Sequence, residues 1–125
     1  MKKKDYRISD YLSHIVQCIQ NIENHTKNLT EEEFLNNQLV KDAVLYNFAI
    51  MGEASNNIKV VDATFLEQYT DLKKVLSLAY RMRNVVIHAY LDVDYLLIWD
   101  TIKYKLPELK SLLAKVEKIS VSCSS

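Results

Sequence analysis

Apolar residues recur at steps of three and four along most of the chain, which is the period of an amphipathic helix. The first such stripe lies within residues 5–27, and two more lie within residues 72–89 and 93–119. Between them, residues 39–58 are apolar on most sides of a helix, a pattern typical of a central or interface helix. Short helices are expected in the two longer connections.

Capping residues and one proline mark the helix boundaries. Thr30 and Glu33 fit a capping box directly before an apolar pair. Asp71 and Asp92 are each placed to cap the helix that follows. Pro107 lies inside the last apolar stripe and has no backbone N–H, so we expect a kink or break a few residues before it.

Glycine and proline are rare, with one of each in 125 residues. Sheets and long loops need turn residues, so this depletion favours long helices joined by short polar connections. The sequence therefore predicts an all-α, up-and-down bundle of four to five helices. At this length we expect a single domain over residues 1–119, followed by a flexible C-terminal tail over residues 120–125.

The formal net charge is zero, from 16 basic and 16 acidic residues. This balance excludes a globally basic nucleic-acid-binding protein as the simplest interpretation. The distribution is uneven, however, because residues 71–90 hold four basic side chains against one acidic side chain, which leaves room for a local basic patch. These residues are Lys73, Lys74, Arg81 and Arg83 against Asp71.

The two cysteines, Cys18 and Cys123, have no metal-binding or redox spacing, and we interpret Cys18 as a small core or flank residue. No apolar run follows the first lysines as in a signal peptide, and none is long enough to span a membrane. We therefore expect a cytoplasmic protein with reduced cysteines, no membrane contact, no metal and no cofactor.

Residues 80–90 combine Arg, Asn, His and Tyr with an apolar Val-Val-Ile run. On a regular helix Asn84 and His88 are one turn apart, whereas Arg83 and His88 project about 140° from each other. Arg83 and His88 can meet if the helix ends near His88, or if a two-fold dimer brings both copies into one cleft. Tyr90 is expected at the end of this helix.

Gly52 and Glu53 lie in the middle of the predicted central helix. A glycine there costs about 1 kcal/mol relative to alanine, so close packing of two backbones is a reasonable cause. Glu53 can be a solvated charge or a partner of the arginines in residues 80–90. We favour the solvated charge.

The polar residues of this segment suit RNA cleavage by phosphoryl transfer without a metal. His88 would act as general base or acid at the 2′-hydroxyl or the leaving oxygen. Arg83 would hold the phosphate and its growing charge, and Asn84 would orient His88 or the phosphate. From physical chemistry alone, a helix whose Arg and His flank an apolar seam and reach solvent is the commoner explanation, and Tyr90 packing at the edge of the core is commoner than a functional Tyr90.

The pattern of Arg83, four residues, His88, one residue and Tyr90 resembles the signature of HepT-like toxins, a branch of the HEPN superfamily. Residues 41–54, which contain Gly-Glu-Ala, and residues 94–107 are similar to the helices before and after that signature. Departures are Arg81 and Ala89, where many relatives have glycine. Neither departure removes a reactive group.

The resemblance implies a HEPN-type helical dimer with Arg83 and His88 in a composite, metal-independent ribonuclease site. It also implies a partner, a minimal nucleotidyltransferase antitoxin that transfers AMP to Tyr90. AMP groups there would place negative charge and bulk beside His88 and Arg83 and block RNA. The expected function is thus an endoribonuclease toxin. The alternative is a non-catalytic HEPN module that binds nucleotide and partners the nucleotidyltransferase.

Overall fold

The computed structural model describes the backbone over residues 8–88 and 92–124, and the side chains over residues 8–85 and 92–116. Every regular element in these ranges is helical, which confirms the all-α prediction. The elements are α1 (Ile8–Thr26), α2 (Glu31–Leu35), α3 (Gln38–Val61), α4 (Ala63–Glu67), α5 (Thr70–His88), α6 (Tyr95–Asp100), a π-helical turn (Thr101–Lys105) and α7 (Leu106–Ser124).

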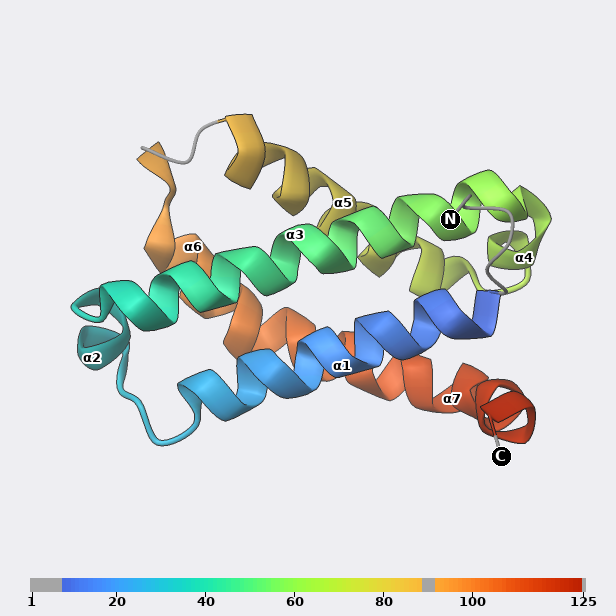
Figure 1. Cartoon of the computed structure of the whole chain (residues 1–125), viewed down its shortest axis with the longest axis horizontal. Helices are drawn as coiled ribbons and strands as arrows, with labels where there is room; N and C mark the ends of the chain where they lie inside the picture. The colour runs from blue at the N-terminus through green and yellow to red at the C-terminus, as the bar shows by residue number, and fades with distance from the viewer. Residues whose placement is uncertain (1–7, 89–91, 125) are drawn as a thin grey trace.

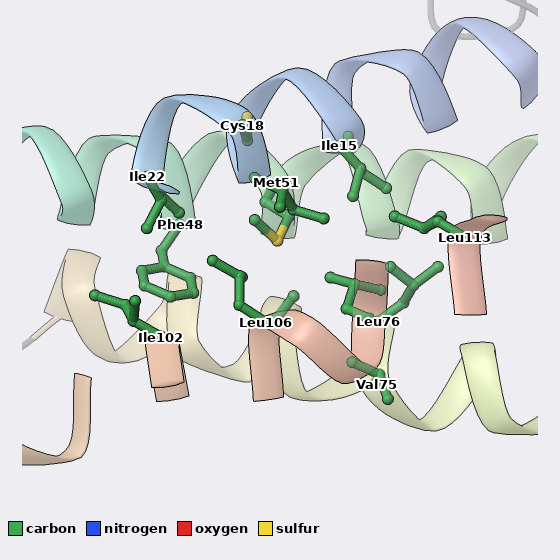
Figure 2. Close-up of a cluster of buried hydrophobic side chains, with 14 of the residues drawn as sticks. Ile15, Cys18, Ile22, Phe48, Met51, Val75, Leu76, Ile102, Leu106 and Leu113 are labelled. Atoms are coloured by element: carbon green, nitrogen blue, oxygen red, sulfur yellow. The ribbon is translucent and has the colours of Figure 1, made fainter. Parts of the chain in front are cut away.

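Helix α3 is the centre of the bundle and packs most extensively against α1 and α5 (Figure 1). Its apolar residues lie on several faces because it has neighbours on several sides, as its sequence predicted. Phe48 and Met51 are almost fully buried, and Figure 2 shows them between side chains of α1, α5 and the α6–α7 segment. The core therefore fixes α5 relative to α3, and the residues of interest lie on these two helices.

Side-chain caps explain where several helices begin. Thr30 and Glu33 form the predicted capping box, with the Thr30 N–H donating to the Glu33 carboxylate and the Glu33 N–H donating to the Thr30 hydroxyl. Asp94, not Asp92, caps α6 by accepting from the Leu97 N–H at 3.1 Å. Asp71 lies in the first turn of α5, where its negative charge faces the positive end of the helix dipole. Both predicted aspartate caps were therefore wrong, because α5 begins one residue before Asp71 and because Asp94 takes the place of Asp92.

The π-helical turn before Pro107 confirms the predicted distortion. Pro107 cannot donate a backbone hydrogen bond, and its ring crowds the carbonyl one turn earlier. The backbone widens at this point, so that the Leu106 N–H donates to the Thr101 carbonyl, five residues back. The predicted last helix is thus divided into α6, the π-helical turn and α7. The backbone stays helical through Ser124. The domain limits and the tail stay predictions.

Cys18 of α1 is a core residue, 4% exposed, and is drawn within the buried cluster of Figure 2. Burial raises the pKa of its thiol to about 11, because the thiolate would lose its hydration. The interpretation of Cys18 as a packing residue is confirmed. Within the described ranges, no helix combines the length and the apolar composition that a membrane span requires.

Candidate active site

The candidate site lies where α3 and α5 cross at Gly52. A Cβ atom on Gly52 would lie 2.4 Å from the Cβ of Arg83 and 2.7 Å from the carbonyl oxygen of Ala79. Distances this short are not tolerated between carbon and backbone atoms, so only glycine lets the two helices approach. The prediction that Gly52 serves close packing is confirmed. Its partner is the backbone and side-chain base of Arg83.

Arg83 is held in place by two polar partners. One guanidinium nitrogen, Nη2, lies 3.0 Å from Oε2 of Glu53, and Nη1 donates to Oδ1 of Asn84 at 2.9 Å. The Arg83 side chain is 27% exposed and that of Glu53 is 40% exposed, so the ion pair is only partly hydrated. A guanidinium carries five N–H groups. Contacts to one carboxylate and one amide oxygen leave others for a phosphate at the surface.

Glu53 is therefore a partner of Arg83, and our preference for a solvated charge was wrong. The crossing at Gly52 explains the pairing, because it brings the next residue of α3 beside the side chain of Arg83. Tyr80 adds a third contact that the sequence analysis missed, since its ring centroid lies 5.8 Å from the Cζ atom of Arg83. The spacing of three residues on one helix was the available signal for Tyr80.

Asn84 was expected to orient His88 or a phosphate. Among the described residues its carbonyl oxygen instead accepts from Arg83, so it orients the guanidinium. This contact between neighbours in sequence gives the guanidinium a second polar partner beside Glu53. A role of Asn84 toward His88 or a phosphate stays a prediction.

The backbone is helical as far as His88, the last described residue of α5. Its side chain and the whole of Tyr90 lie outside the described residues. Five residues of α-helix separate Arg83 from His88 by about 7.5 Å along the axis. One chain thus supplies a guanidinium held by two polar partners and, on the same helix, the backbone position of the histidine. Convergence of their side chains on one phosphate stays a prediction.

An apolar groove of about 530 Å³ lies between α5 and the α6–α7 segment. Val85, Leu97 and Tyr104 line it and are 49%, 55% and 73% exposed. The groove follows the helix that carries Arg83, within one turn of that residue.

The fold and site together define an all-α bundle with an arginine-centred polar cluster at the crossing of its two central helices. The family described as Ribonuclease HepT-like matches residues 15–116, and the chain belongs to this family. "Putative RNase MJ1216" of Methanocaldococcus jannaschii is 38% identical over 119 residues, which cover 94% of this chain and 92% of that protein. "Probable ribonuclease HepT" of Thermococcus cleftensis is 36% identical over 109 residues, or 87% and 94% of the two chains. No solved structure gives a significant match.

Proposed function

We propose that this protein is a metal-independent endoribonuclease toxin that a minimal nucleotidyltransferase antitoxin silences by transferring AMP to Tyr90. The observation that carries the proposal is the position of Arg83. Its guanidinium is held by Glu53 and Asn84 at the Gly52 crossing and its side chain is 27% exposed, on the helix that also carries His88. Membership of a ribonuclease family supports RNA as the substrate.

In the proposed reaction, the 2′-oxygen of a ribose attacks the adjacent phosphorus and the bond to the 5′-oxygen of the next nucleotide breaks. His88 takes the proton from the 2′-hydroxyl or gives one to the departing 5′-oxygen. Arg83 stabilises the extra negative charge on the phosphoryl oxygens. The products are a 2′,3′-cyclic phosphate and a 5′-hydroxyl, so protons and charge balance without a further reactant.

The proposed composite site requires a homodimer, and an exposed apolar surface beside α5 supports one. The apolar groove beside α5 leaves Val85 and Leu97 half exposed, which is costly in water and favours cover by a second chain. Asp100 and Lys105 in the lining give the groove charges of both signs. A two-fold axis places the same surface on both partners, so each acidic group can meet a basic group of the other copy.

The test of the activity is cleavage of single-stranded RNA by the purified protein in the presence of EDTA. We expect the wild type to cleave under these conditions and His88→Ala and Arg83→Ala to lose cleavage while keeping the helical circular dichroism spectrum. Equal cleavage by the wild type and both variants would mean that the activity comes from elsewhere. Nucleotide binding without any cleavage would instead favour the non-catalytic module, for which the zero net charge is the argument.

The role of Tyr90 is tested by co-expression with the proposed partner, a minimal nucleotidyltransferase, followed by measurement of the intact mass of this protein. We expect mass increments of AMP on the wild type and none on Tyr90→Phe, together with loss of RNA cleavage by the modified protein, because the added phosphates repel RNA. Tyr104→Phe is the matched control, since Tyr104 is 73% exposed and lies on the apolar groove. AMP increments that persist in Tyr90→Phe contradict the assignment.

A further inference from the structure

A second, polar pocket lies along the seam between α3 and α5, toward the N-terminal end of α5 from the Gly52 crossing. Its volume is about 190 Å³. Two α5 cations and one α3 cation line it, together with an amide and hydroxyl groups. These residues are Lys59, Lys73 and Arg81 with Asn56, Ser77 and Tyr80. Two basic residues of the 71–90 segment, Lys73 and Arg81, thus line the pocket together with Lys59 of α3. The sequence alone did not place Lys59 beside them.

Among the described residues, no carboxylate lines this pocket. Lys73 does reach Glu67 at 3.2 Å, but both side chains are well exposed, and exposed ion pairs of this kind are weak and easily exchanged. In the described part of the chain, the side chains of Lys59 and Arg81 form no ion pair or hydrogen bond. The described residues that line the pocket therefore leave it with a net positive charge.

Other cations contrast with this arrangement. Lys110 pairs with Glu23 at 3.2 Å, Lys105 lies 4.0 Å from Glu108, and Lys103 lies over the ring of Trp99. Although the formal net charge is zero, two cations that pair with no described side chain, Lys59 and Arg81, lie together on the α3–α5 seam. Such local concentration, and not net charge, determines where an anionic strand binds.

The pocket is continuous with the candidate active site through Tyr80. This side chain lines the pocket and also lies 5.8 Å from the guanidinium carbon of Arg83. On α5, Lys73 and Arg83 are ten residues apart, or about 15 Å along the helix axis. A single strand of a few nucleotides that follows the seam can therefore place one phosphate at Arg83 and another in the pocket.

We propose that this pocket binds a backbone phosphate of the RNA strand on one side of the cleaved bond. The inference rests on the proposed ribonuclease function and names the residues that hold the substrate away from the reacting atoms. Lys59 and Arg81 neutralise the phosphate, and Asn56 and the Tyr80 hydroxyl supply donors at its edge. A free nucleotide carries the same phosphate chemistry, so the test includes one.

The test compares Lys59→Gln, Arg81→Gln and the double variant with Lys110→Gln, a loss of one positive charge on α7. All are made in a His88→Ala background, so that RNA survives the measurement. Fluorescence anisotropy gives the affinity for a single-stranded RNA of about ten nucleotides over a series of salt concentrations, and AMP and inorganic phosphate serve as further probes. Circular dichroism melting checks that each variant is folded.

We expect the double variant to bind RNA about tenfold more weakly at low salt. The slope of log affinity against log salt should fall by about 0.7 for each lost phosphate contact. Lys110→Gln should leave affinity and slope unchanged. With His88 intact, the loss should appear as a higher KM for RNA cleavage.

Unchanged RNA affinity and slope in the double variant overturn the proposal. Loss of AMP or phosphate affinity alone, with RNA binding intact, also overturns it and assigns the pocket to a free anion. If the wild type binds RNA in this salt-dependent way and never cleaves it, the proposed function fails while the pocket stands. If cleavage is present and the slope does not respond, the pocket inference alone fails.

Discussion

Gly52→Ala is expected to destabilise the protein, although alanine is the better helix former by about 1 kcal/mol. The added Cβ would lie 2.4 Å from the Cβ of Arg83 and 2.7 Å from the Ala79 carbonyl oxygen. Neither atom can rotate away, because one belongs to the backbone and the other is bonded directly to it. Helices α3 and α5 must therefore separate, and overpacking of this kind costs about 1–3 kcal/mol.

Urea unfolding followed by circular dichroism measures this effect. Tyr46→Ala is the matched control on α3, since Tyr46 is 67% exposed, and we expect its free energy of unfolding to change by less than about 0.5 kcal/mol. A Gly52→Ala protein more stable than the wild type would show that helix propensity outweighs the contact. The crossing would then be looser than the distances imply.

The same substitution should lower RNA cleavage in the fraction that stays folded. Arg83 moves with α5, whereas Glu53 moves with α3, so separation of the helices changes the orientation of the guanidinium. A displacement of about 1 Å at a catalytic group can cost about a hundredfold in rate. We expect a loss of about ten- to a hundredfold at a temperature well below the unfolding midpoint.

Much of the fold follows from local sequence signals. The capping box at Thr30 and the distortion before Pro107 depend on chemistry within a few residues, and both were predicted correctly. The cap of α6 was predicted wrongly for a local reason, because Asp92 and Asp94 are equally suited by residue type. Only the position of the Leu97 N–H distinguishes them, and Asp94 accepts its hydrogen bond.

The site was harder to predict because its contacts join distant parts of the chain. Arg83 was singled out from residues 80–90, but its partner Glu53 is thirty residues earlier on another helix. The relative rotation of α3 and α5 decides that contact, and the core sets this rotation, not the Arg or the Glu. Gly52 was the useful clue, since a glycine in a helix marks a close approach without naming what approaches.

Arg83→Ala and His88→Ala are each expected to lower cleavage by about 10²–10³-fold, the usual range for loss of one charge-stabilising or proton-transferring group. Mixing the two inactive proteins tests whether the site is shared between chains. After joint refolding, about half of the two-fold dimers should contain one chain of each kind. In these dimers one intact Arg83 and one intact His88 remain, on different chains.

A shared cleft predicts recovery of cleavage in the mixture to about a tenth or more of the wild-type rate. A site formed within one chain predicts none, because each chain of the mixed dimer lacks one of the two groups. The control mixes Arg83→Ala with the double variant Arg83→Ala/His88→Ala, which contains no intact Arg83, and native mass spectrometry verifies that mixed dimers form. Mixed dimers without recovered activity would place both groups in one chain, with His88 reaching back from the end of α5 toward Arg83. Helical geometry favours the shared cleft, because a projection difference of about 140° separates the two side chains on one helix, and a two-fold axis removes that separation.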